Sequence, residues 1–360
     1  MHEQARTYMK RIIMNIICCI GYLVGVLLFA WPDIRGLVSE QENQVVIQEF
    51  EEIVNQRKAQ TKAPEDDKET SDSDAESEGE ALPAASDELL WAMKAYNTEL
   101  YETGQTSLED PWSYETESLD LTQYGIYNNL IGILTVPKMD LELPIYLGAN
   151  KTNMAKGAAL LGQTSFPLTG ENVNAVLAAH RGWRGIPMFR EIQKLELGDR
   201  LTIRNYWETL TYQVTDIKVV LPYEVDNIFI QPGKNRVTLI TCHPYTKNSH
   251  RYVVCCELVG ENMSVNDGTK STVSGQTSDN STGSEKSDGK NNSSGLISST
   301  DSTLQESAEQ TREAAIAEDK ETMEKEKKER IIGYIVIAIL GVVAAYAMFG
   351  TGRKNKKSSK

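Results

Sequence analysis

The two longest apolar runs of the chain lie near its two ends. They cover residues 12–31 and 331–350, and each is about as long as a helix that crosses the hydrocarbon core of a bilayer. Lys10 and Arg11 precede the first run, a bias that predicts a cytoplasmic N-terminus. Because two spans return the chain to the side on which it began, residues from about 32 to 330 are predicted to be extracellular.

A cleaved signal peptide would begin with the same charged and apolar pattern. The end of the first run, Phe-Ala-Trp-Pro at 29–32, lacks the small residues that a signal peptidase prefers. The pattern therefore favours an anchor that stays in the cell membrane. We expect residues 1–35 to form a cytoplasmic N-terminus and the first transmembrane helix, residues 331–350 the second transmembrane helix, and residues 351–360 a basic cytoplasmic tail.

A block in the middle of the chain has the residue pattern of β-structure. Short runs rich in β-branched residues are separated by Gly, Pro and Asn, and one helix-like interlude interrupts them at 188–195. The expected strands are 132–136, 143–146, 173–179, 200–204, 210–220, 236–242 and 251–259. This pattern predicts a mainly β fold, either a barrel or a sandwich. The block from about 84 to 261 is long enough to bury a core.

An amphipathic helix is expected to precede the strands. Ser86 is a residue type that caps helix N-termini. Leu89, Met93, Tyr96 and Leu100 then follow at helical spacing and mark one apolar face. We expect that face to pack on the folded block.

Two polar stretches separate this block from the apolar runs. Residues 36–83 are expected to form an acidic extracellular linker that begins as a charged, helix-prone segment at about 38–60. Between positions 65 and 80 it holds nine Asp or Glu residues and a single Lys, which predicts a solvated spacer. Residues 262–330 begin with a stretch rich in Ser, Thr and Asn, which is typical of a flexible tether. From about residue 304 this stretch is predicted to continue as a charged helix.

The overall charge and the cysteines narrow the possible functions. A net charge of −14 argues against a nucleic-acid partner, because no basic surface is available to neutralise phosphates. Of the five cysteines, Cys255 and Cys256 are neighbours on a predicted strand, where their side chains point to opposite faces and are not expected to pair. Cys242 stands apart from the others, and an unpaired thiol in an exported chain is a candidate for reactivity.

The candidate chemistry lies at the ends of two predicted strands. His180 follows the apolar run 175–179, and Cys242 follows the run 237–241. A thiolate attacks acyl carbons well, and a nearby imidazole both lowers the pKa of the thiol and can protonate a leaving amine. Arg251 opens the next strand, and a hairpin of that length returns it to the cysteine, where a guanidinium can stabilise a thiolate or an oxyanion.

Taken one at a time, each of these side chains also has a structural explanation. A cysteine at a strand end is often a small core residue, a lone histidine often makes structural hydrogen bonds, and an arginine at a strand start is often solvated. Metal binding by Cys242, His243 and His250 would not match a recognised ligand spacing. We expect neither a metal nor an organic cofactor.

The local sequences around these residues resemble one known family. Thr-Leu-Ile-Thr-Cys at 238–242 fits the TLxTC signature of the sortases, the surface transpeptidases of Gram-positive bacteria. The histidine segment of that family resembles 179–182, and its arginine segment resembles 250–251. Further similarity lies in 157–167 and 195–199, so that the resemblance covers essentially the whole β-rich block. It implies a sortase-type closed β-barrel with short helices.

A second feature resembles one class of that family. Asp110-Pro111-Trp112 precedes the first predicted strand and looks like the lid of class C, pilin-polymerising sortases, in which Asp and an aromatic residue cover the cysteine. The C-terminal span also suits that class. His243 departs from it, because Thr is expected after the cysteine. Thr241 and His243 border the cysteine, and this position makes them candidate substrate-binding residues, with the imidazole at 243 expected to alter substrate preference.

The resemblance implies a membrane-anchored cysteine transpeptidase. Cys242 would cleave an LPXTG-like sorting signal between Thr and Gly and form a thioacyl enzyme, which an amine such as a pilin lysine would displace. His180 would protonate the leaving amine, and Arg251 would stabilise the oxyanion or orient the peptide. The implied partners are LPXTG-type surface or pilin proteins. Two rivals remain, namely attachment of proteins to cell-wall precursor and a non-catalytic surface scaffold that binds peptides.

Overall fold

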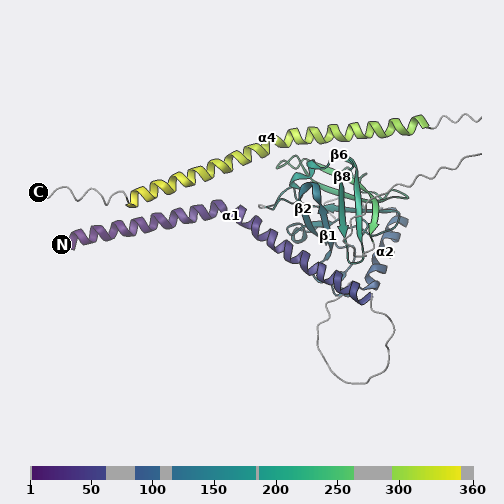
Figure 1. The fold of residues 1–360 in the computed structure, drawn as a ribbon, viewed down its shortest axis with the longest axis horizontal. Helices are drawn as coiled ribbons and strands as arrows, with labels where there is room; N and C mark the ends of the chain where they lie inside the picture. The colour runs from purple at the N-terminus through teal and green to yellow at the C-terminus, as the bar shows by residue number, and fades with distance from the viewer. Residues whose placement is uncertain (1, 62–85, 106–115, 184–185, 263–293, 350–360) are drawn as a thin grey trace, which may run out of the picture.

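Within the residues that the computed structural model describes, eight strands close into one barrel (Figure 1). These residues are 2–61, 86–105, 116–183, 186–262 and 294–349. The strands are β1 (Leu130–Val136), β2 (Leu141–Leu147), β3 (Ala158–Leu160), β4 (Val173–Ala178), β5 (Arg200–Arg204), β6 (Thr209–Val220), β7 (Asn235–His243) and β8 (His250–Asn262). They follow the order β1-β2-β3-β4-β7-β8-β6-β5, and β5 pairs with β1 to close the barrel. The expected closed barrel is confirmed.

Seven of these strands coincide with the expected runs to within three residues at each end, and β3 is the strand that the pattern did not reveal. Its three residues are all buried and are too few to show a period. β3 pairs in parallel with β2 and antiparallel with β4. This short strand therefore lies between β2 and β4 and connects them in the barrel.

Helix α2 (Asp87–Glu102) precedes the strands and packs on the barrel. It begins as expected at Ser86, whose hydroxyl accepts a hydrogen bond from the Leu89 N–H at 3.3 Å. The Asn97 side chain donates to the Phe166 carbonyl at 3.0 Å and accepts from the Phe166 N–H at 2.8 Å. The buried apolar residues of α2 are Leu89, Met93 and Leu100. The shorter helices are η1 (Leu121–Tyr124), η2 (Pro137–Met139), α3 (Lys151–Met154) and η3 (Met188–Lys194).

Helix α1 (His2–Thr61) continues from the first apolar run onto the barrel, where it lies against β2 (Figure 1). Ile47, Phe50 and Val54 recur at helical spacing, are almost fully buried and belong to the main core. Residues 36–61, expected as the helix-prone start of the linker, are helical but also pack on the barrel, because this apolar stripe gives them a surface to bury. The acidic run that follows lies outside the described residues.

Helix α4 (Ser294–Phe349) packs on β6 and η3 before it continues into the second apolar run (Figure 1). Ala308, Ala315 and Asp319 are at most 2% exposed and face the barrel. The charged helix expected from about residue 304 is present within α4, and it packs on the barrel, a contact that was not predicted. The Ser/Thr/Asn-rich stretch at 263–293 lies outside the described residues.

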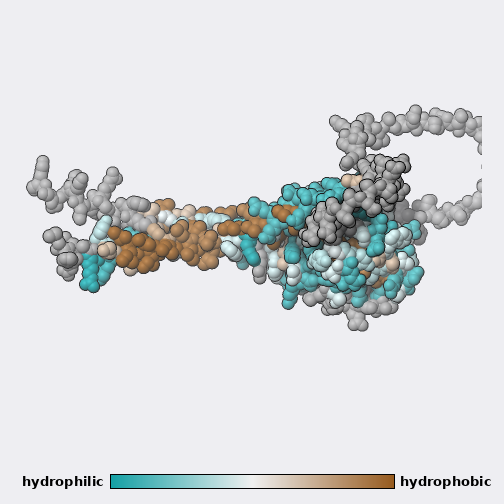
Figure 2. All heavy atoms as spheres, turned by 90° about the horizontal axis from the view of Figure 1, so that it is seen from below, coloured by the Kyte–Doolittle hydropathy of each residue, from teal (hydrophilic) through white to brown (hydrophobic). Residues whose placement is uncertain are grey.

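The apolar parts of α1 and α4 lie side by side, and the N-terminal end of α1 and the C-terminal end of α4 are at the same end of this pair (Figure 1). The Tyr22 hydroxyl donates to the Ile337 carbonyl at 3.0 Å and lies where a side chain at Gly341 would otherwise be. Phe29 and Tyr334 meet edge to face, with ring centroids 5.0 Å apart. Figure 2 shows a hydrophobic surface along the pair and a hydrophilic one over the barrel. By length and composition, both helices can cross a membrane.

The sheet is buried on both faces where β4 and β7 run side by side. Cys256 belongs to the main core, whereas Cys255 belongs to a second cluster with Val176 and Ile240 on the other face. Both cysteines are free, as predicted. This two-sided packing holds the ends of β4 and β7 in fixed positions.

A substitution at Gly157, directly before β3, tests how closely β2 and β3 approach each other. A Cβ atom at this position would lie 2.3 Å from the Pro144 carbonyl oxygen, so we expect Gly157→Ala to lower the free energy of unfolding by about 1–3 kcal/mol. Gly260→Ala is the matched control, because a Cβ atom there meets nothing within 4 Å. Urea unfolding of the two variants is the measurement, and equal stabilities would contradict the tight packing of β3.

Candidate active site

His180 and Cys242 lie just beyond the paired ends of two neighbouring parallel strands. The last partners in the register of β4 and β7 are Ala178 and Ile240, and each catalytic candidate is two residues further on. The pairing continues past the strand end, because the Ala179 N–H donates to the Ile240 carbonyl at 3.2 Å. Since residues two apart on a strand share a face, both candidates lie on the same face of the sheet.

A cleft of about 380 Å³ opens at this end of the sheet. Both His180 and Cys242 line it, so the structure brings these two predicted residues together. The other lining residues come from the segment after β4, from the turn between β7 and β8, and from α3. They are Met154, Ala179, Arg181, Gly182, Trp183, Tyr245, Thr246 and Asn248.

The His180 imidazole stacks on the Trp183 indole, with ring centroids 4.4 Å apart and an interplanar angle of 11°. The His180 carbonyl accepts a hydrogen bond from the Phe189 N–H at 3.0 Å, which fixes its backbone. Burial lowers the pKa of His180 below its ordinary value of 6.5, so the ring is neutral at neutral pH and can accept a proton. Trp183 also lines a cavity of about 220 Å³ with Arg35 and Val38 of α1.

Cys242 is half-buried, and its thiol is held in the protonated form. Burial raises the pKa of the thiol above its ordinary value of 9.0, while the positive charges of Arg251 and Arg181 act in the opposite direction. The resting pair at neutral pH is therefore a thiol beside a neutral imidazole. Such a pair reacts when the imidazole takes the thiol proton as the sulfur attacks.

Arg251 lies directly opposite Cys242 in the antiparallel register of β7 and β8, as the expected hairpin requires. Its guanidinium donates to the carbonyls of Asn248 at 3.1 Å and His250 at 2.8 Å. It is not among the residues that line the cleft, and its charge acts on Cys242 from the neighbouring strand.

Thr241 and His243 do not line the cleft. The two residues are 1% and 3% exposed, because neighbours of Cys242 on β7 point away from its face. The Thr241 hydroxyl donates to the Ala179 carbonyl at 2.7 Å and so ties β7 to the residue before His180. His243 Nδ1 lies 2.8 Å from the Arg181 guanidinium.

Arg181 is a residue of this region that the sequence analysis missed. Its guanidinium donates to the Cys242 carbonyl at 3.2 Å and to Gln193 Oε1 at 3.0 Å, and it pairs with Asp319 of α4. It also lies 5.5 Å from the centre of the Tyr252 ring. The available signal was an arginine directly after a strand-end histidine, but a buried role could not be inferred without knowledge of its counterion.

The predicted lid residues Asp110, Pro111 and Trp112 lie outside the described residues. The chain that leads to them is fixed at Gln105, whose side chain donates to the Gln163 carbonyl at 3.2 Å and accepts from the Ile230 N–H at 2.7 Å.

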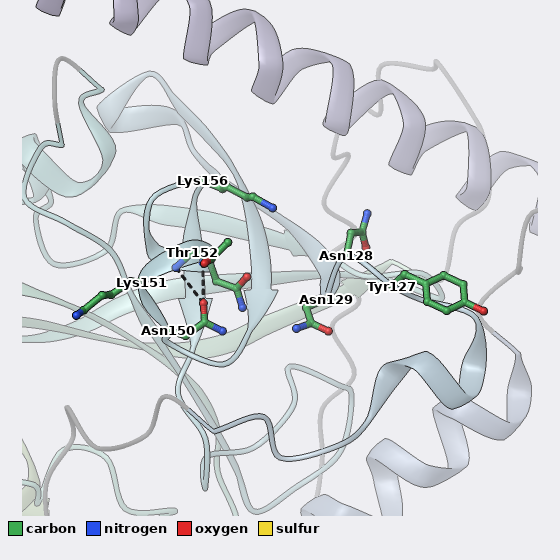
Figure 3. Close-up of a pocket in the computed structure, with 8 residues that line it drawn as sticks. Tyr127, Asn128, Asn129, Asn150, Lys151, Thr152 and Lys156 are labelled. Carbon is green, nitrogen blue, oxygen red and sulfur yellow. Dashed lines mark hydrogen bonds between the residues drawn. The ribbon is translucent and has the colours of Figure 1, made fainter.

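A separate cavity of about 480 Å³ lies between the loop before β1 and α3 (Figure 3). Its lining consists of Tyr127, Asn128, Asn129, Asn150, Lys151, Thr152, Asn153 and Lys156. The Asn150 side chain accepts from the Thr152 and Asn153 N–H groups and so caps α3 (Figure 3). This lining offers neither a thiol nor an imidazole. Across the described part of the chain, no group of three Cys, His, Asp or Glu residues is placed to hold a metal ion.

Comparisons with known proteins agree on one family. The sequence profile of the sortase domain matches residues 134–259. Sortase A of Bacillus anthracis is 30% identical over 165 residues, which cover 46% of this chain and 74% of that protein. Sortase D of Bacillus subtilis is 32% identical over 115 residues, which cover 32% and 55%. The solved structure of Streptococcus agalactiae sortase C1 with MTSET is 31% identical, with a TM-score of 0.44, and the match covers 49% of this chain and 90% of that one.

The pKa of Cys242 predicts how its reactivity depends on pH. Because the raised pKa leaves little thiolate at neutral pH, alkylation of Cys242 by iodoacetamide is expected to accelerate about tenfold per pH unit and to keep rising above pH 9. Replacing the nearby charge in Arg251→Met is expected to shift this curve to higher pH. Peptide mass spectrometry separates Cys242 from the other four cysteines, and a rate that levels off below pH 8 would contradict a protonated thiol.

Proposed function

This chain belongs to the sortase family, and from that premise we propose that it is a membrane-anchored cysteine transpeptidase that processes LPXTG-like sorting signals. The members of the family are cysteine transpeptidases. The observation that carries the proposal is the position of Cys242 and His180, which line one cleft from the ends of two paired strands. A nucleophile and a proton carrier on rigid strands keep the geometry that acyl transfer needs.

In the proposed reaction, the Cys242 sulfur attacks the carbonyl carbon of the Thr–Gly bond while His180 takes the thiol proton. The tetrahedral intermediate collapses to a thioester as His180 returns that proton to the departing glycine amine. An incoming amine then loses a proton to His180 and attacks the thioester. The new amide forms as the Cys242 thiolate leaves, and His180 returns the proton to that thiolate, which restores the resting pair. The Arg251 charge, which lowers the pKa of Cys242, favours the thiolate that leaves in this last step.

We assign both apolar helices to the membrane, with the two termini in the cytoplasm and the barrel outside. Lys10 and Arg11 support this orientation, and the common end of α1 and α4 supports an even number of crossings. An anchored enzyme meets substrates that are anchored in the same membrane at a raised effective concentration.

The proposed acceptor is the lysine of a pilin, so that the reaction assembles pili. The support is the Asp110-Pro111-Trp112 motif, which resembles the lid of class C sortases, and the span at the C-terminal end. Attachment of surface proteins to cell-wall precursor uses the same chemistry with a different amine. We also propose that Thr241 and His243 influence substrate choice; since both are buried, they would act through the strand that carries Cys242.

The first test is covalent capture on Cys242. The full chain in detergent is mixed with LPXTG-type peptides, and intact-mass spectrometry is expected to find a thioacyl adduct that disappears when an amine is added. Cys242→Ala is expected to give no adduct, whereas Cys18→Ser, a matched replacement in the apolar part of α1, is expected to keep it. An adduct that persists in Cys242→Ala would refute the assignment, and no adduct in wild type would favour the peptide-binding scaffold.

The second test concerns the lid. If Trp112 covers the cleft for nine-tenths of the time, Trp112→Ala is expected to speed peptide cleavage by about tenfold, because a closed lid scales the apparent affinity by the open fraction. Trp91→Ala is the matched control, since Trp91 on α2 is 72% exposed. Single-turnover kinetics measure the effect, and identical rates for both variants and wild type would exclude a gating role.

A further inference from the structure

A carboxylate from the C-terminal helix is buried next to the cleft. Asp319 of α4 is 1% exposed and forms an ion pair with Arg181, whose side chain is 3% exposed. The two residues are 138 positions apart in the sequence. Arg181 follows His180 directly and donates to the Cys242 carbonyl at 3.2 Å. Asp319 is therefore separated from the backbone of Cys242 by a single side chain.

The same carboxylate holds a wall of the cleft. Its second oxygen, Oδ1, accepts a hydrogen bond at 2.8 Å from the N–H of Tyr245, which lines the cleft in the turn after β7. The Tyr245 hydroxyl in turn donates at 3.1 Å to Glu326, which follows Asp319 about two turns further along α4. Glu326 also binds Arg190 of η3 at 2.6 Å. Acidic residues of α4 thus hold both segments that flank the cleft.

His243 also lies where α4 packs against Arg181. Its Nδ1 lies 2.8 Å from the Arg181 guanidinium, and its Nε2 lies 3.4 Å from the Glu318 carboxylate of α4. Lys247, in the turn after β7, lies 3.8 Å from Glu318. The imidazole at position 243 therefore faces α4 and Arg181 on the side of β7 opposite to the cleft.

We propose that Asp319 is a positioning residue for the reaction at Cys242, and that α4 thereby forms part of the active-site architecture. The inference rests on the proposed transpeptidase function. The Asp319 side chain pairs with the buried Arg181 guanidinium, so that Arg181 stays bound to the Cys242 carbonyl and Tyr245 stays at the edge of the cleft. When Asp319 is replaced by a neutral residue, the Arg181 guanidinium loses its counterion and is driven towards water. The contact of Arg181 with the Cys242 carbonyl and the contact that holds Tyr245 are then both lost.

The test uses the full chain in nanodiscs and counts active sites by alkylation of Cys242. In Asp319→Asn, kcat per reactive Cys242 thiol is expected to fall at least tenfold, while KM stays within about twofold, because Asp319 touches no substrate. Glu321→Gln removes the same charge from the exposed face of α4 and is expected to match wild type. A loss of reactive thiols with unchanged kcat for the remainder would show a purely structural contact and would overturn the proposal.

A double variant separates positioning from stability. Arg181→Met with Asp319→Leu replaces the buried pair by apolar side chains, which is expected to restore Tm but not kcat, because the contacts to Cys242 and Tyr245 are still missing. Recovery of kcat together with Tm would overturn the proposal.

A failure of the proposed function is distinguishable from a failure of this inference. If wild type forms no thioacyl adduct, the transpeptidase proposal fails, and the positioning is judged by hydrogen exchange alone. Backbone exchange across 243–248 is then expected to be at least tenfold faster in Asp319→Ala than in Glu321→Gln. Equal exchange in the two variants would refute the role of Asp319.

Discussion

The parallel pairing of β4 with β7 is the constraint on which the candidate active site depends. It aligns the ends of two strands at Ala178 and Ile240, whose positions differ by 62, so that residues two positions beyond this last pair project from the same face. The side-by-side strands are packed on both faces, which leaves little freedom at their ends. The hairpin of β7 and β8 then adds Arg251 opposite Cys242. Backbone pairing among β4, β7 and β8 therefore positions His180, Cys242 and Arg251.

The sequence predicted the parts of this arrangement that depend on local pattern. Seven strands, the cap at Ser86 and the return of Arg251 to Cys242 follow from short-range spacing. Strand β3 has three buried residues and therefore no readable period. The docking of α1 was missed because its apolar stripe at Ile47, Phe50 and Val54 is embedded among many charged residues. The role of Arg181 was missed because its partner lies in a distant segment that composition alone describes as a charged helix.

The buried ion pair of Arg181 and Asp319 makes α4 part of the same folded unit as the barrel. Removal of one partner from a buried pair costs about 3–5 kcal/mol, which is a large share of the roughly 5–15 kcal/mol that stabilises a typical domain. The barrel and α4 are therefore expected to depend on each other, although the stretch of sequence that connects them, 263–293, is polar. A boundary drawn at residue 261 follows the change of composition, whereas the packing extends to Asp319 and Glu326 of α4 and, on α1, back to Ile47.

Helix α1 and the segment after β4 line one cavity, and this arrangement relates the position of the cleft to the end of the apolar run. Arg35 and Glu42 line the same cavity as Trp183, the residue stacked on His180. Glu42 lies eleven residues beyond Trp31, where the apolar run ends, and a helix rises about 17 Å over that length at 1.5 Å per residue. Roughly five extended residues bridge the same distance. In the proposed orientation, α1 therefore holds the cleft at a set distance from the membrane surface. A bond joined to its own membrane anchor by many more residues reaches Cys242 only when its tether folds back, which lowers its effective concentration at the thiol, whatever its side chains.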